Sequence, residues 1–251
     1  MILEVNNVKF AYNGKAVLKN VALGVQEGEM LVILGPNGVG KTTLLRCINA
    51  ILKPKAGTIM VDGRDVLKME PKAIARRVGY VAQSQAKTRM TAFDAILMGR
   101  KPHLHFRTSE KDLHMVDGAI KVLGLEELAM RHIDEMSGGE LQKVAVGRAL
   151  VQEPRLLLLD EPTSSLDLKN SMNILSLIKR VVREHRVSAV MTMHNLNAAL
   201  RFADKFVFLK GGTIHSAGEI REVSADMIKE VYDIPVEILH HKGRPLVVPL
   251  N

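Results

Sequence analysis

The sequence predicts an α/β fold built around a mostly parallel sheet, and three observations lead to this expectation. A hydrophobic strand at Met30–Leu34 runs through a glycine-rich loop into a helix at Thr42–Leu52. A continuous apolar run at Arg155–Asp160 is typical of a strand covered on both faces. Strand and helix patterns then continue to alternate as far as Leu209. Such alternation favours right-handed crossovers between parallel strands.

The N-terminal part of the chain predicts a different kind of sheet. Apolar and polar residues alternate over Ile2–Phe10 and again over Val17–Gln26. The pair Asn13-Gly14 between them is typical of a hairpin turn. We therefore expect an N-terminal antiparallel β subdomain. Further strands are expected at Gly57–Gly63 and Val78–Ala82.

A mostly helical pattern from about Ser84 to Val151 interrupts the alternation, and we interpret it as an inserted helical segment. Ser109 is placed to cap a helix that Gly124 ends. The expected apolar stripe of that helix is Leu113, Val116, Ile120 and Leu123. After the strand at Arg155–Asp160 a helix is expected with the stripe Ile174, Leu175, Leu177, Ile178, Val181 and Val182, then a strand at Val187–Met193 and short outer strands over Val236–Leu250.

Composition narrows the possible partners. Of the net charge of +8, most lies between Arg64 and Lys111, where eleven Lys/Arg stand against four Asp/Glu. Such a block could meet nucleic acid or the anionic inner leaflet of a membrane, or be a solvated surface. The absence of Trp and an aromatic content of 4% leave little for bases to stack on, so nucleic acid is not expected.

Cysteine use and hydropathy indicate a compartment. The single Cys47 excludes an internal disulfide and fits a reducing environment, where it is most simply a small buried hydrophobe. No stretch approaches 18 consecutive apolar residues, and the N-terminus lacks the layout of a signal peptide. We expect a chain that is soluble and stays inside the cell.

The loop Gly35-Pro-Asn-Gly-Val-Gly-Lys41-Thr42 fits the pattern G-x-x-x-x-G-K-[ST] after a strand and before a helix. Its residues Gly35, Asn37, Gly38 and Gly40 present backbone N–H groups to phosphate oxygens, and the helix N-terminus adds partial positive charge. Lys41 would reach the β- and γ-phosphates, and the Thr42 hydroxyl would bind Mg²⁺. Thr43 can donate to a phosphate as well. The sequence therefore predicts a P-loop NTPase core.

Two acidic residues end the buried strand at Leu156–Asp160, at the sheet edge where α/β folds bind ligands. Asp160 would hold Mg²⁺, directly or through water. Glu161 is adjacent but differently aimed, and it is the candidate to polarise the attacking water.

The stretch Glu135-Met-Ser-Gly-Gly-Glu-Leu-Gln-Lys143 places two glycines, Gly138 and Gly139, at the start of a strong helix-forming run. Glycine costs roughly 0.5–1 kcal/mol against alanine inside a helix, so the pair indicates a close neighbour, either backbone or phosphate. Ser137 and Glu140 have the spacing of a capping box, which explains those two residues but not both glycines.

Together these motifs resemble a known family, the nucleotide-binding ATPase subunits of ABC transporters. The resemblance extends over nearly the whole chain and rests on the phosphate loop Gly35–Thr42, Gln83 after a strand, Ser137–Glu140, Leu156–Glu161, Ser165–Asp167 and His194, all in the family's order. It implies a single ABC ATPase domain over residues 1–251. In that domain 1–83 and 152–251 form a RecA-like core with the antiparallel β subdomain, and 84–151 form a helical signature subdomain.

The resemblance also implies roles for individual residues. Tyr12 would stack on adenine, although a packed core aromatic explains that residue about as well when it is taken alone. Gln83 would sense the γ-phosphate and Mg²⁺, while His194 would hydrogen-bond the γ-phosphate and position Glu161. The signature residues of one subunit would close over the γ-phosphate held by its partner; they are Ser137, Gly138, Gly139 and Glu140, with Asp167 supporting them across the dimer. On this interpretation the glycines clear the way for phosphate from another chain.

This chain departs from the family's usual signature at two positions. The family usually has leucine before the serine and glutamine after the glycines, where this chain has Met136 and Glu140. Met136 is a tolerable apolar exchange. The Glu140 charge near an anion could weaken closure, although it also lies at a positive helix end.

As cofactors and partners the resemblance implies ATP and Mg²⁺, a homodimer, integral membrane permease subunits and, indirectly, an extracytoplasmic substrate-binding protein. It implies a peripheral location on the cytoplasmic side of the cell membrane. The runs Val231–Glu237 and Arg244–Pro249 resemble the importer subfamily for iron(III)-siderophore, haem and cobalamin complexes. Molybdate/tungstate importers share that architecture, and soluble ABC-type ATPases acting on nucleic acid or ribosomes are the alternative from another class.

Overall fold

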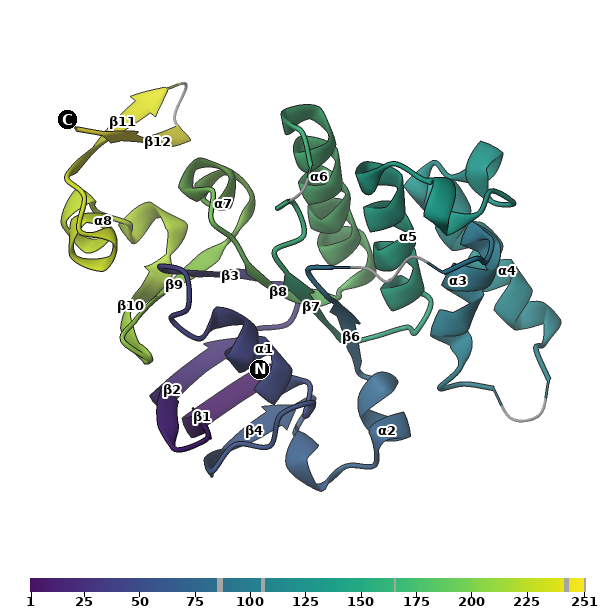
Figure 1. Cartoon of the computed structure of the whole chain (residues 1–251), viewed down its shortest axis with the longest axis horizontal. Coiled ribbons are helices and arrows are strands. Elements are labelled where there is room, and N and C mark those ends of the chain that lie inside the picture. The colour runs from purple at the N-terminus through teal and green to yellow at the C-terminus, as the bar shows by residue number, and fades with distance from the viewer. Residues whose placement is uncertain (85–87, 105–106, 165, 242–243, 251) are drawn as a thin grey trace.

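A six-stranded sheet forms the centre of the molecule in the computed structural model, which describes residues 1–84, 88–104, 107–164, 166–241 and 244–250 (Figure 1). The strand order is β10-β9-β3-β8-β7-β6, and only the β10–β9 pair is antiparallel. The strands are β3 (Met30–Leu34), β6 (Val78–Val81), β7 (Leu156–Asp160), β8 (Ser188–Thr192), β9 (Lys205–Lys210) and β10 (Thr213–Glu219). The predicted α/β fold with a mostly parallel sheet is confirmed.

A separate antiparallel sheet with the strand order β2-β1-β4-β5 lies on one side of this centre. Its strands are β1 (Leu3–Tyr12), β2 (Lys15–Val25), β4 (Ala56–Val61) and β5 (Arg64–Asp65). The β1–β2 hairpin turns at Asn13 and Gly14, whose φ angles of 45° and 85° are both positive, as the favoured two-residue hairpin turn requires. The strand expected at Gly57–Gly63 pairs with β1 and so belongs to this sheet.

The central sheet has a hydrophobic core on each face because successive side chains of a strand point to opposite sides. On β3, Leu31 and Ile33 pack with the antiparallel sheet and with helix α1 (Lys41–Ile48). Its alternate residue Val32 points toward the layer of α5 (Gly138–Leu150), α6 (Leu168–His185) and α7 (Leu196–Phe202). Figure 1 shows these layers on either side of the sheet. Covering both faces explains why the strand is apolar throughout.

Cys47 lies on α1 inside the first of these cores. Its side chain is 0% exposed, so the expectation of a small buried hydrophobe is confirmed. Burial raises the pKa of its thiol to about 12.

The chain between β6 and β7 forms the helices α3 (Ala92–Leu97), α4 (Glu110–Leu123) and α5, and the short α2 (Pro71–Ala75) precedes β6. Ser109 caps α4 with a capping box, and Gly124 ends it with a φ of 59°, as predicted. The predicted stripe is wrong at Leu113, which is 42% exposed. Asp112 is buried instead, because its carboxylate binds an arginine inside this region.

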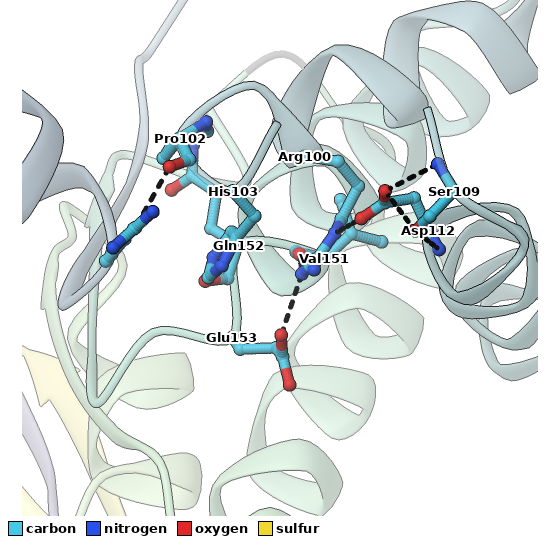
Figure 2. A network of polar contacts seen from close by, with 9 residues as sticks. Arg100, Pro102, His103, Ser109, Asp112, Val151, Gln152 and Glu153 are labelled. Atoms are coloured by element: carbon cyan, nitrogen blue, oxygen red, sulfur yellow. Dashed lines mark hydrogen bonds and ion pairs between the residues drawn. The ribbon is translucent and has the colours of Figure 1, made fainter. Parts of the chain in front are cut away.

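That arginine, Arg100, joins three parts of the helical region (Figure 2). It is 3% exposed, and its Nε donates to Asp112 Oδ1 at 2.8 Å. Its Nη1 donates to the Val151 carbonyl and, at 2.8 Å, to Glu153 Oε2, both just beyond α5. Hydrogen bonds from the Ser109 hydroxyl and backbone N–H, together with Arg100, hold the pKa of the Asp112 carboxyl well below its usual range.

The C-terminal part adds helix α8 (Ala225–Tyr232) and the hairpin of β11 (Val236–His241) and β12 (Arg244–Pro249). Asn197 of α7 holds this hairpin, because its side-chain amide donates to the Val247 carbonyl at 3.2 Å and accepts from Val247 N at 2.7 Å. Among the helices in the described ranges, none combines the length and apolar character needed to cross a membrane.

Replacing Asp112 by asparagine should destabilise the fold at neutral pH by about 3 kcal/mol, because it leaves the buried Arg100 with only the partly exposed Glu153 as a charged partner. Since the folded-state pKa of Asp112 is lowered, its contribution is fully present above the unfolded pKa of about 3.9 and is lost as pH falls through the lower folded value. The difference between D112N and wild type in urea unfolding should therefore be constant from pH 7 to 5 and shrink below pH 4.

Asp117→Asn on the same helix is the matched control. Asp117 pairs with Lys121 at 2.7 Å, but the two side chains are 54% and 64% exposed. Losing such a surface pair should change stability by less than about 0.5 kcal/mol. Equal losses in the two variants would contradict the importance given to the Arg100 network.

Candidate functional site

The predicted phosphate loop connects the C-terminal end of β3 to the start of α1. Its three glycines Gly35, Gly38 and Gly40 have φ angles of 145°, 75° and 113°, a region that side chains with a Cβ rarely adopt. At Gly40 a Cβ would also meet side-chain atoms of Leu18 and Val17 at 3.0 and 3.1 Å. The glycines are therefore needed for the shape of the loop itself.

Lys41 begins α1 and turns back across the loop. Its Nζ donates to the carbonyls of Gly35 at 2.8 Å and Pro36 at 3.0 Å, and the residue is 5% exposed. Burial lowers the pKa of this ammonium, and the nearby Glu161 and Asp160 carboxylates oppose that shift. The structure therefore places the buried Lys41 ammonium against the backbone of the phosphate loop.

Asp160 ends β7 and is 1% exposed. Hydroxyl groups from three segments donate to its carboxylate: Thr42 at 3.0 Å, Thr192 at 2.8 Å and Tyr80 at 3.4 Å. The predicted pair of Thr42 and Asp160 is thus brought together. Hydroxyl and carboxylate oxygens are ligands that Mg²⁺ prefers, so the residues present fit this ion.

The next residue, Glu161, has a left-handed backbone with a φ of 49°. Its N–H donates to Thr192 Oγ1 at 2.9 Å. Its carboxylate accepts from Gln83 Nε2 at 2.6 Å and is hydrogen-bonded by His194 Nε2. The structure therefore brings together the three residues predicted to be catalytic. Gln83 precedes Glu161 by 78 positions, and His194 follows it by 33.

A cavity of about 500 Å³ opens over this cluster. Its lining combines the loop, the catalytic cluster and one aromatic side chain: Tyr12, Val17, Asn37, Gly38, Gly40, Lys41, Thr42, Thr43, Gln83, Glu161 and His194. Tyr12 is 43% exposed and packs edge-on against Phe10, with ring centroids 4.8 Å apart. It is therefore a partly open aromatic at the rim, as stacking on a base requires.

The predicted signature residues lie at the start of α5. Ser137 caps the helix, its N–H and hydroxyl both donate to Glu140 Oε2 at 2.8 Å, and these bonds lower the pKa of Glu140. Among the described residues that line the cavity, none comes from Ser137–Glu140. Ser165 lies outside the described residues, whereas Asp167 caps α6 and accepts from Asn170 N at 2.7 Å.

Gly139 has a close neighbour within the same chain. A Cβ added there would meet the side-chain amide of Asn170 at 3.0–3.3 Å. The Asn170 amide is held in turn by Asp167 Oδ2 at 3.1 Å. The contact of α5 with α6 therefore gives one reason for glycine at 139, while Gly138 is exposed.

One threonine and two tyrosines of the site were not predicted. Thr192 is a hydroxyl at the end of a buried strand, a pattern that could have indicated it. Tyr80 lies on β6, and its hydroxyl contact with Asp160 depends on the strand order. Tyr232 contacts Gly35 N at 2.9 Å from 197 positions away, and no local pattern in the sequence indicates it.

Comparison with known proteins gives consistent matches. A family model described as ABC transporter matches residues 18–164. An uncharacterized ABC transporter ATP-binding protein of Methanocaldococcus jannaschii is 46% identical over 100% of this chain and 99% of its own length. The petrobactin import ATP-binding protein of Bacillus subtilis is 32% identical over 94% of this chain and 95% of its own length. A cobalamin import ATP-binding protein of Halobacterium salinarum is 34% identical over 95% of this chain and 60% of its own length.

Solved structures agree with these relatives. A metal-chelate type ABC transporter in an inward-facing conformation matches with a TM-score of 0.87 and 29% identity, over 100% of this chain and 97% of that one. A dimeric ATP-binding cassette in a post-hydrolysis state, bound to ADP and Pi, matches with a TM-score of 0.78 and 27% identity, over 88% of this chain and 100% of that one.

A double-mutant cycle should show which neighbour requires Gly139. Gly139→Ala should lower the free energy of unfolding despite the better helix propensity of alanine, because the Asn170 side chain would have to shift by a few tenths of an ångström and so strain its bond with Asp167. Adding Asn170→Ala should relieve the clash, with a coupling energy of about 1 kcal/mol in urea unfolding.

The ATPase rate of the same variants separates the two explanations of the glycine. If phosphate held by a partner chain also needs the bare backbone, G139A/N170A should be as stable as N170A but hydrolyse ATP more slowly than N170A. Equal rates would leave the contact with Asn170 as the whole reason for glycine at this position.

Proposed function

Because this chain belongs to the ABC transporter family of ATP-binding proteins, we propose that it is the ATP-hydrolysing subunit of an importer that takes up a metal-chelate cargo through a separate membrane permease. The chain is an ATPase of this family. The observation that carries the mechanism is the cluster of Gln83, Glu161 and His194 beside the phosphate loop. Lys41 and Thr42 of the phosphate loop line one cavity together with this cluster.

Phosphate binding rests on the loop and on Lys41. Residues Gly40–Thr43 at the start of α1 line the cavity, so their backbone N–H groups would bind phosphate oxygens there, and the helix end adds partial positive charge. Lys41 is already at the loop, bonded to the Gly35 and Pro36 carbonyls, so its ammonium needs only a local shift to reach phosphate oxygens.

Glu161 is the general base of the proposal. Its carboxylate faces the cavity and would accept a proton from the water that attacks the γ-phosphate. Gln83 and His194 bond one carboxylate oxygen each, Oε2 and Oε1, so the group has a fixed orientation before substrate arrives. His194 is then placed to hydrogen-bond the γ-phosphate. These two residues act by fixing the position of the base.

Thr42 and Asp160 would hold Mg²⁺, with the side-chain oxygen of Gln83 as a third ligand. When bound, the ion neutralises charge on the β- and γ-phosphate oxygens. The Asp160 carboxylate is prepared for this because three hydroxyl groups already stabilise its charge.

We propose that the working form is a homodimer in which Ser137–Glu140 of one subunit close over the nucleotide of the other. Two findings support this. The signature residues do not line the cavity of their own chain among the residues described, and a similar cassette is dimeric with ADP and Pi. The Glu140 carboxylate accepts hydrogen bonds from the Ser137 N–H and hydroxyl, which partly offset its charge and would reduce its repulsion of phosphate.

Closure of the two subunits would drive the permease between inward- and outward-facing states, and hydrolysis would reset it. The chain would then lie on the cytoplasmic face of the membrane, where the basic block Arg64–Lys111 suits an anionic leaflet. An extracytoplasmic binding protein would deliver the cargo.

The metal-chelate assignment is supported by the relatives named for petrobactin and cobalamin import and by the metal-chelate type neighbour. A relative from Alcaligenes faecalis, 33% identical over 92% of this chain, is named for phosphonates import, so cargo class needs its own test.

Glu161→Gln should lower the steady-state ATPase rate by at least about a hundredfold, because glutamine keeps the shape but cannot accept the proton. ATP affinity should stay within about threefold of wild type, since phosphate binding uses other groups. Isothermal titration with ATP and a phosphate-release assay measure the two quantities. The exposed Glu127→Gln on another surface is the matched control. Full turnover in E161Q would remove Glu161 from the base role.

Affinity capture of the tagged protein from gently solubilised membranes of its own host, followed by mass spectrometry, tests the transport function. We expect a multi-span membrane protein to co-purify. Reconstituted with its binding protein, that complex should show ATPase activity stimulated by a metal chelate. Stimulation by molybdate or phosphonate instead would change the cargo, whereas recovery only with ribosomes or DNA would overturn the transport function.

A further inference from the structure

The hydroxyl of Tyr232 accepts a hydrogen bond from the backbone N–H of Gly35 at 2.9 Å. Gly35 is the first residue of the phosphate loop, and Tyr232 is the last residue of α8, in the C-terminal part of the chain. The Gly35 N–H was expected to face phosphate, and this expectation is wrong: the N–H bonds Tyr232 instead, and Gly35 is not among the described residues that line the cavity. The contact therefore links two parts of the chain that the mechanism does not otherwise connect.

Gly35 is fixed on three sides. Its N–H meets Tyr232, and its carbonyl accepts from Lys41 Nζ at 2.8 Å. A Cβ on Gly35 would lie 2.3 Å from the Leu209 carbonyl at the end of β9, so its third side is closed by backbone. Tyr232, Gly35 and Lys41 thus form a chain of contacts that runs from α8 to the cation at the mouth of the loop.

Helix α8 is itself firmly attached, so Tyr232 is a fixed point. Ile228 and Val231 are 1% and 0% exposed. The Tyr232 ring packs edge-on against Phe208, with centroids 6.3 Å apart. Outside the core, His215 of β10 bonds Glu230 Oε2 at 2.8 Å. Burial raises the pKa of the Tyr232 phenol to about 12, so the acceptor stays neutral at every pH near neutrality.

We propose that Tyr232 is a positioning residue for ATP binding, which holds the phosphate loop in its phosphate-binding shape through the Gly35 N–H. The role rests on the proposed ATP site. Without the hydroxyl, a buried N–H would have no acceptor, and the loop would gain by rotating the Gly35 peptide toward another one. Those rotated states would compete with the binding-competent state and weaken apparent affinity in proportion to their population.

Tyr232→Phe removes only the hydroxyl and keeps the ring in contact with Phe208. We expect the Kd and KM for ATP to rise about three- to tenfold while kcat stays within about twofold, because the competent state, once occupied, is unchanged. The effect should be the same from pH 6 to 9, since the phenol does not titrate there. His215→Gln is the matched control, because it alters a contact of the same helix that does not reach the loop.

Hydrogen exchange without nucleotide gives a second readout. Peptides spanning Met30–Lys41 should exchange faster in Y232F than in wild type and H215Q. Unchanged exchange together with an unchanged Kd would overturn the proposal, as would equal effects of Y232F and H215Q on both. If wild type itself did not bind ATP, the proposed function would fail, and the exchange rates would still decide whether Tyr232 holds the loop.

Discussion

The site depends on one buried carboxylate, that of Asp160. An ionised carboxylate that is 1% exposed costs several kcal/mol to desolvate unless other groups stabilise its charge. The hydroxyls of Thr42, Thr192 and Tyr80 do so, and they come from the start of α1, the end of β8 and the middle of β6. Satisfying this one charge therefore fixes where the phosphate loop and two neighbouring strands stand relative to β7.

The neighbouring acid, Glu161, points in another direction, and backbone conformation makes the difference. At Glu161 the chain turns into the left-handed region, which costs a residue with a Cβ about 1–2 kcal/mol. Thr192 takes up the N–H exposed by that turn, so the hydroxyl that stabilises Asp160 also supports the strained residue. Two adjacent carboxylates thus point to different places, one into the sheet edge and one toward the cavity.

The roles of Tyr12, Gln83 and His194 followed from the resemblance to ABC ATPase subunits. Local patterns in the sequence were enough to predict most of the strands, the phosphate loop, the acids Asp160 and Glu161, and the caps at Ser109 and Ser137. Each of these depends on short-range spacing or on a strand end, and parallel strands end at one edge. Interactions between distant segments were harder. Helical periodicity placed Leu113 in the core because it could not show that Arg100 would need Asp112 there. The contact of Tyr232 with Gly35 depends on how the C-terminal helix packs, which no local pattern encodes.

The burial of Cys47 has a practical consequence. It is the single cysteine of the chain, and a thiol that is fully buried with a pKa near 12 carries almost no thiolate in neutral solution. Maleimide and methanethiosulfonate reagents should therefore leave the native chain unmodified. Fluorophores or spin labels can be attached at one introduced surface cysteine without first removing Cys47, so distances across an assembled complex can be followed on an otherwise natural background.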